Sequence, residues 1–181
     1  MIFHASPLDG AWVIEPEFTT DERGAFARVF CTRDFEERGL ESSFVQTSIS
    51  INSRCGTLRG MHFQARPHAE TKLVRCTRGR LFDVILDLRE TSATFCHWFG
   101  IELSADNRQT LYVPRGFAHG FVTLADDTEV LYQIDTFYEP TAARGVRWND
   151  PAFGIQWPIE PLVTSARDGS YPDFNRTLVG Q

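Results

Sequence analysis

The chain has 181 residues, of which 42% are hydrophobic and 23% charged. This length and composition predict one folded domain over residues 1–181 and exclude a disordered chain. The net charge of −6 disfavours nucleic-acid binding, and no apolar run approaches the roughly 18 residues of a membrane-spanning helix.

Cysteine usage and the first residues predict a cytoplasmic protein. The segment 1–10 lacks the basic, apolar and small-residue pattern of a secretory signal. The four cysteines form no CxxC pair, so we expect reduced thiols and no zinc or redox motif. They are Cys31, Cys55, Cys76 and Cys96.

The hydrophobic pattern predicts short β-strands along most of the chain. A short helix follows the first strand, with Thr32 as its cap, residues 34–38 as its body and Gly39 at its end. Many short strands separated by turn signals favour a sandwich or barrel. The predicted strands are 26–30, 44–51, 58–63, 73–76, 81–88, 95–103, 110–113, 117–123 and 129–137.

The clearest strand, 81–88, alternates apolar residues with Asp83 and Asp87. This period of two predicts one buried face and one exposed face. Residues 77–80 contain Gly79 and predict a hairpin turn that joins this strand to the strand at 73–76.

Lysine is almost absent from the chain, which has seventeen arginines and the single lysine Lys72. A general preference for arginine explains the ratio, but it does not explain why one lysine is kept. An ammonium group is more compact than a guanidinium and has a more adjustable pKa, so Lys72 is a candidate functional residue.

Two motifs resemble the halves of the cupin signature, a small β-barrel pattern, at residues 56–64 and 114–121. Metal-binding cupins have a His-x-His pair and a later Glu in the first half, and a His in the second. Here Gln64 replaces the second His of the pair, which leaves His62, His119 and Glu70 as possible ligands. The pattern therefore disfavours a metal site. His119 is alternatively a buried, hydrogen-bonded structural histidine.

A longer series of motifs extends over roughly residues 10–172. The segments are 18–26, 44–46, 58–64, 71–76, 83–89, 113–121, 131–132, 138–140, 145–151, 157–158 and 165–168. Together they closely resemble the dTDP-4-dehydrorhamnose 3,5-epimerase family of nucleotide-sugar enzymes. So many ordered motifs are specific for the family, and less so for one substrate within it.

The resemblance implies an all-β, cupin-type jelly roll with a few short helices and with no metal or redox cofactor. It also implies a homodimer in which the N-terminal segment helps to complete the partner's site. The implied substrate is a nucleoside-diphosphate 4-keto-6-deoxy sugar, such as dTDP-4-dehydro-6-deoxyglucose. The implied reaction is epimerisation at the carbons that flank the ketone.

Four residues match the catalytic positions of the family. His62 is the expected base, because an imidazole titrates near neutral pH. Asp168 is the carboxylate that would hold the imidazole, and Lys72 would stabilise the enolate oxygen. Tyr132 would return a proton to the opposite face of the sugar.

Eight further residues match substrate-binding positions. A guanidinium such as that of Arg59 suits a diphosphate. Asp83 matches a position that faces the barrel interior, where it would orient Lys72 or neutralise its charge. The expected substrate-binding set is Arg23, Phe26, Gln46, Arg59, Asp83, His119, Tyr138 and Arg167.

Two departures from the family pattern fall on nucleotide recognition. The family usually has Glu where this chain has Arg28, and Asn where it has Ser48. A guanidinium in place of a carboxylate reverses both charge and hydrogen-bond polarity. An epimerase of a CDP- or GDP-linked sugar, or one that inverts only C3 or C5, is therefore an alternative. More remote alternatives are a metal-dependent dioxygenase and a sugar-binding module without catalysis.

Overall fold

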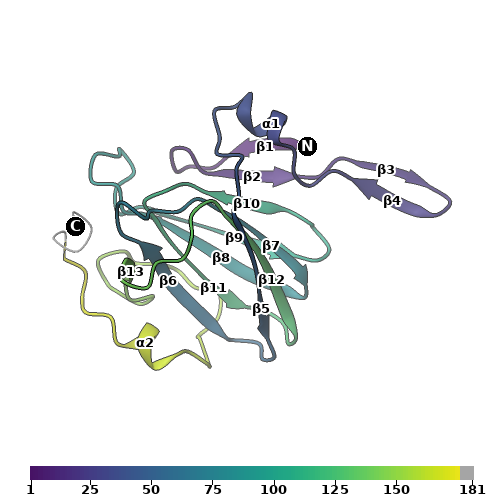
Figure 1. Cartoon of the computed structure of the whole chain (residues 1–181). Coiled ribbons are helices and arrows are strands. Elements are labelled where there is room, and N and C mark those ends of the chain that lie inside the picture. The colour runs from purple at the N-terminus through teal and green to yellow at the C-terminus, as the bar shows by residue number, and fades with distance from the viewer. Residues whose placement is uncertain (176–181) are drawn as a thin grey trace.

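The computed structural model describes residues 1–175 as two antiparallel β-sheets, a projecting hairpin and two short helices (Figure 1). The six-stranded sheet has the order β1 (Ile2–Ala5), β2 (Trp12–Glu15), β10 (Thr110–Val113), β7 (Lys72–Arg78), β12 (Thr128–Ile134) and β5 (Gln46–Asn52). The five-stranded sheet has the order β13 (Ala143–Gly145), β6 (Leu58–Gln64), β11 (Phe117–Thr123), β8 (Arg80–Asp87) and β9 (Trp98–Ser104). The hairpin pairs β3 (Phe18–Asp21) with β4 (Gly24–Ala27), and the helices are α1 (Thr32–Glu36) and α2 (Ala166–Gly169).

The main core lies between the two sheets. Val74 and Val130 of the six-stranded sheet pack in one buried cluster with Leu81, Ile85 and Phe121 of the five-stranded sheet. Their aliphatic and aromatic side chains leave water together, which is the dominant stabilising term for such a sandwich.

Strand β8 is buried on both faces, whereas the sequence predicts an exposed face. Val84 and Leu86 belong to a second core cluster on the outer side of the five-stranded sheet. Val146 and Phe153 from the C-terminal part of the chain cover this side. The residues of the other face point into the sandwich, so Asp83, which the alternation places on the exposed face, has an exposed fraction of 0%.

The predicted hairpin at residues 77–80 is wrong. Strand β7 pairs with β10 and β12, while β8 pairs with β9 and β11 in the other sheet. The chain therefore crosses between the sheets at Gly79, which has a φ of +73°. A Cβ there would lie 2.6 Å from Thr128 Oγ1, so the crossing requires glycine.

The predicted helix is present, but its boundaries differ. The N-cap of α1 is Cys31, without a side-chain capping bond, and Thr32 is already helical. Phe35 anchors the helix because it is fully buried in an aromatic cluster. The strand predicted at 26–30 is β4, which ends at Ala27, and its partner β3 was not predicted.

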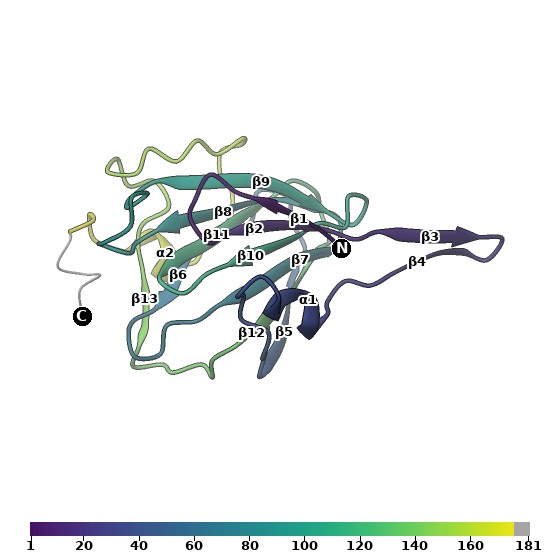
Figure 2. The same ribbon diagram turned by 90° about the horizontal axis from the view of Figure 1, so that it is seen from above.

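The β3–β4 hairpin projects away from the sandwich (Figures 1 and 2). It carries exposed apolar side chains, with Phe18 at 44% and Phe26 at 78% exposure. Strand β5, at the edge of the six-stranded sheet, also exposes Ile49 and Ile51. Within residues 1–175, no helix is long and apolar enough to cross a membrane.

Candidate active site

The centre of the site is a hydrogen bond between His62 of β6 and Asp168 of α2. His62 Nε2 lies 2.7 Å from Asp168 Oδ1, and the Gly60 N–H donates to Asp168 Oδ2 at 3.2 Å. The Asp168 side chain is 5% exposed, whereas that of His62 is 41% exposed. The carboxylate therefore holds the Nε2 edge of the imidazole, and the exposed part of the ring is open to a ligand.

The electrostatics of this pair keep the carboxylate charged. Burial by itself would raise the pKa of Asp168, but the His62 hydrogen bond and charge, with the Gly60 and Ser165 bonds, hold the pKa below its ordinary value. Asp168 is thus ionised at neutral pH. An ionised carboxylate orients the imidazole and stabilises its protonated form, as a general base requires.

A second histidine–carboxylate pair lies on the neighbouring strands. His119 of β11 pairs with His62 in register, and its Nε2 lies 2.6 Å from Asp83 Oδ1 of β8. Both side chains are buried, and Asp83 Oδ2 has no hydrogen-bond partner among the described residues. The contact that the structure gives Asp83 is therefore with His119, and not with Lys72.

The His119 ring also meets Tyr132 of β12, with ring centroids 6.1 Å apart and nearly perpendicular. Burial, and then the charge of Asp83, raise the pKa of Tyr132 above its ordinary value. The phenol is therefore protonated at neutral pH, which is the form that can donate a proton.

Lys72, at the start of β7, forms an ion pair with Glu70, with Nζ 2.8 Å from Oε1. The Gln64 Nε2 group donates to the other Glu70 oxygen at 3.0 Å. An ammonium has three donors, so this pair leaves donors for a ligand. From the sequence, Glu70 was expected only as a possible metal ligand. Within residues 1–175, no group of three or more His, Cys, Asp and Glu side chains is arranged to hold a metal ion.

Three of the expected binding residues lie on elements around this centre. The Tyr138 N–H donates to Gln46 Oε1 at 2.7 Å, which brings these two residues together. The Arg59 Nε donates to Asn52 Oδ1 at 2.7 Å, and the buried Asn52 also donates to the Thr128 carbonyl at 3.1 Å. Asn52 was missed by the sequence analysis because its contact depends on the β5–β12 pairing.

A second missed residue, Tyr171, lies next to the His62–Asp168 pair. The centroid of the Tyr171 ring is 6.4 Å from that of His62. The guanidinium carbon of Arg167 lies 6.0 Å from the centroid of the Tyr171 ring. The side chain of Arg167 also interacts with Tyr138. Arg167, one of the expected binding residues, thus contacts both Tyr138 and the Tyr171 ring that lies beside His62.

The structure does not bring Arg23 and Phe26 to this centre within one chain. Both lie on the projecting hairpin, where the Arg23 side chain is 83% exposed and pairs with Asp21. The two positions that depart from the family pattern also lie on different elements. Ser48 of β5 pairs in register with Tyr132, whereas Arg28 follows the hairpin and lies 4.0 Å from the Cys31 sulfur.

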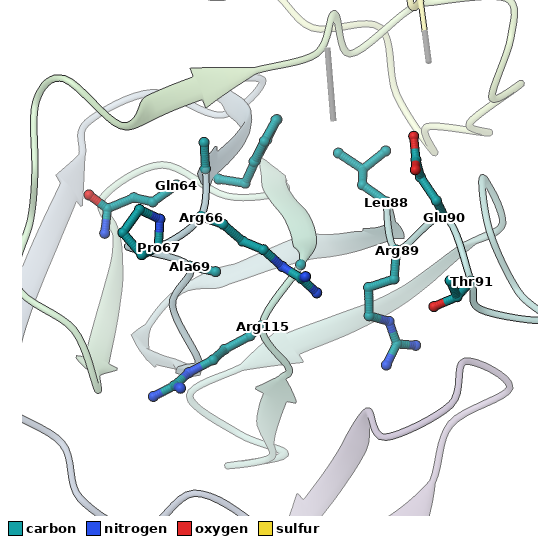
Figure 3. A pocket seen from close by; sticks show the side chains of 12 residues that line it. Gln64, Arg66, Pro67, Ala69, Leu88, Arg89, Glu90, Thr91 and Arg115 are labelled. Carbon is teal, nitrogen blue, oxygen red and sulfur yellow. The ribbon is translucent and has the colours of Figure 1, made fainter. Parts of the chain in front are cut away.

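A cavity of about 600 Å³ lies elsewhere, between the loops after β6, β8 and β10 (Figure 3). Arg66, Arg89 and Arg115 line it, together with Glu90. None of the four expected catalytic residues lines this cavity. Arg89 is paired with Asp87 at 2.8 Å and Arg115 with Asp135 at 2.7 Å, so two of its three cations are already neutralised.

Comparison with known proteins places these features in a family. The family model described as dTDP-4-dehydrorhamnose 3,5-epimerase matches residues 5–176. The chain belongs to this family. A curated dTDP-4-dehydrorhamnose 3,5-epimerase from Methanothermobacter thermautotrophicus is 46% identical over 180 residues, covering 98% of this chain and 96% of the relative.

Solved structures of epimerases share the fold over most of their length. The dTDP-4-dehydrorhamnose 3,5-epimerase from Elizabethkingia anophelis is 44% identical, with a TM-score of 0.94 and coverage of 96% of both chains. The enzyme from Bacillus anthracis, with TDP and PPi bound, is 40% identical, with a TM-score of 0.91 and coverage of 96% and 99%. A 3'-monoepimerase from Streptomyces bikiniensis, in complex with dTDP-quinovose, is 32% identical, with a TM-score of 0.86 and coverage of 94% and 86%. The expected cupin-type jelly roll is confirmed.

Proposed function

We propose that this chain is a 3,5-epimerase of dTDP-linked 4-keto-6-deoxy sugars. The observation that carries the proposal is the His62–Asp168 pair, with a buried ionised carboxylate behind an exposed imidazole. Family membership supports the substrate class, because the curated relatives are named for this reaction. The reaction is proton abstraction next to a ketone, followed by reprotonation from the other side.

In the proposed first step, His62 takes the proton from the carbon next to the C4 ketone. The C–H electron pair becomes the carbon–carbon double bond of an enolate, and the carbonyl electrons move to its oxygen. His62 becomes an imidazolium, which the ionised Asp168 stabilises at 2.7 Å. The Lys72 ammonium stabilises the enolate oxygen, and such a preorganised cation is effective in a site shielded from water.

In the second step, Tyr132 donates its proton to the opposite face of the same carbon. The electron pair of the double bond forms the new C–H bond, the ketone is restored, and Tyr132 is left as a phenolate. Exchange with water returns the His62 and Tyr132 protons to their starting places. The His119–Asp83 pair lies beside this proton donor, because the ring centroids of His119 and Tyr132 are 6.1 Å apart.

The nucleotide and its diphosphate would be held by residues around this centre. Arg59 and Arg167 supply guanidinium groups, which suit phosphate oxygens. Tyr138 and Gln46, which are hydrogen-bonded to each other, lie on the proposed nucleotide side. No step in this scheme uses a metal or a redox cofactor.

The experiment that tests the function is incubation with dTDP-, CDP- and GDP-linked 4-keto-6-deoxy sugars in deuterated water, followed by NMR. We expect deuterium at both C3 and C5 of the dTDP-linked sugar, and slower exchange with the other nucleotides. Exchange at one carbon only would support the monoepimerase alternative. Exchange with none of the sugars, together with near-stoichiometric bound metal in the purified protein, would favour the dioxygenase alternative.

We also propose that the protein acts in the cytoplasm as a homodimer in which the β3–β4 hairpin reaches the partner subunit's site. The hairpin projects from the sandwich (Figure 2). It exposes Phe26, and the edge strand β5 exposes Ile49 and Ile51. Exposed apolar side chains of this kind are typical of an interface with a second copy. This arrangement would bring Arg23 and Phe26 to a site from which they are absent in a single chain.

Mixing two inactive variants tests this arrangement. In a heterodimer of Arg23→Ala and His62→Asn chains, one of the two sites has both native residues. With random exchange, about half of the dimers are mixed, so we expect about a quarter of wild-type activity to return. The measurement is the epimerisation rate before and after subunit exchange. Activity no higher than the mean of the two separate variants would contradict a shared site.

A further inference from the structure

Tyr171 lies against the proposed base in a space that glycine provides. It follows Asp168 by three residues, and its ring meets that of His62 edge-on, with an interplanar angle of 69°. On the other side lies Gly145 of β13, which pairs in register with His62. A Cβ on Gly145 would lie 2.2 Å from Tyr171 Cζ.

Backbone conformation does not require glycine at position 145, since the φ of Gly145 lies outside the left-handed region. The missing side chain is therefore explained by the space that the Tyr171 ring needs. Contacts with His62, Gly145 and Arg167 hold the ring in one position. A ring held in this way restricts the movement of the His62 imidazole.

The Tyr171 hydroxyl is buried, and its proton has no acceptor among the described residues. Arg167 is a donor only, so it cannot accept this proton. Burial raises the pKa of Tyr171, and the hydroxyl therefore keeps its proton at neutral pH. A buried donor without an acceptor is unfavourable, and a ligand oxygen would relieve this cost.

We propose that Tyr171 is a binding and positioning residue, whose hydroxyl donates to a phosphate oxygen of the bound nucleotide sugar while its ring holds His62. The inference rests on the proposed function. Arg167 beside the phenol makes the surroundings favourable for an anion, and His62 on the other side places the sugar next to it. In this proposal, the Tyr171 hydroxyl lies where the diphosphate joins the sugar.

The Tyr171→Phe variant tests the hydroxyl, because it keeps the ring. We expect the Kd for dTDP, measured by calorimetry, and the KM for the nucleotide sugar to rise about tenfold, while kcat changes less than twofold. Loss of an interaction made equally in the ground state and the transition state has this signature. Tyr112→Phe is the matched control, since Tyr112 lies in the aromatic cluster around Phe35. It should leave both constants unchanged.

The ring is tested by Tyr171→Leu and Gly145→Ala. Each should lower kcat about tenfold or more, the first by removing the ring and the second by displacing it. The double variant should be no worse than Tyr171→Leu alone, because both changes act on one contact. Circular dichroism and the melting temperature confirm that each variant is folded.

Three outcomes separate this inference from the function on which it rests. An active wild-type protein whose Tyr171→Phe variant binds dTDP with unchanged affinity would overturn the role of the hydroxyl alone. Additive losses of kcat in the double variant would overturn the role of the ring. A wild-type protein that neither binds dTDP nor exchanges deuterium would overturn both the inference and the proposed function.

Discussion

The His62→Asn variant is expected to lose deuterium exchange at both sugar carbons, by a hundredfold or more. Asparagine is polar and of similar size to histidine, but it cannot take up a proton at neutral pH. General base catalysis usually contributes about a hundredfold or more to a rate. Because one base serves both carbons in the proposed reaction, C3 and C5 should lose exchange together. NMR in deuterated water measures both signals in one sample.

The loss should belong to the pair and not to folding. Asp168→Asn removes the charge that stabilises the imidazolium at 2.7 Å, so it should also lower the rate strongly. Combining the two changes should add little, because both act on one proton transfer. His4→Asn is the matched control, since His4 lies on β1 and pairs with Glu15. If the His62→Asn variant keeps more than about a tenth of the wild-type exchange, His62 is not the sole base.

The pH dependence of stability follows from the same contact. The pKa of Asp168 is lower in the folded chain than in the unfolded one, so the folded state favours its ionised form. Its stabilising contribution is therefore complete above the unfolded pKa of about 3.9 and is lost as the pH falls through the folded value. If the protein loses stability just below neutral pH, protonation of Asp168 is therefore not the cause.

The Tyr132→Phe variant is expected to exchange deuterium into the substrate while it makes little epimer. The base and the cation are intact in this variant, so the enolate still forms. With the donor on the opposite face removed, the enolate is reprotonated mainly from the His62 side, which restores the original configuration. The measurement is the ratio of deuterium incorporation to epimer formation, followed by NMR over the same time course.

Other outcomes would change the role of Tyr132. If exchange and epimerisation fall together, Tyr132 positions the sugar or stabilises the enolate, and another group is the acid. If epimerisation is unchanged, Tyr132 is a barrel-lining aromatic residue. The packing of its ring against His119, with centroids 6.1 Å apart, and against the main core would then serve only the stability of the fold.

The local pattern of the sequence determined most of the strands and the family of the protein. Strands such as 110–113 and 117–123 were predicted with the bounds that the structure has. The order of the motifs identified the nucleotide-sugar epimerase family, and with it the jelly roll. These features are readable because alternation and motif spacing are properties of neighbouring residues.

The tertiary structure decided which sheet each strand joins and which face is buried. Gly79 marks a turn in the sequence, but only the placement of β7 and β8 in different sheets shows that the turn is a crossing between sheets. Likewise, Asp87 alternates with apolar residues as an exposed residue would, yet it is fully buried. Its charge is satisfied there by Arg89, Ser92 and Thr94, and local alternation carries no information on such partners.

The site divides in the same way. The sequence by itself pointed to His62, Lys72, Tyr132 and Asp168 through the family motifs. The contacts of Glu70 with Lys72, of Asp83 with His119, and of Tyr171 with His62 emerged only from the fold. The contacts of Asp83 and of Tyr171 join segments that are far apart in the chain, and these segments meet only through strand register or the course of the C-terminal segment. Long-range pairing of this kind is set by the packing of the whole sandwich and not by the residues next to each other in the chain.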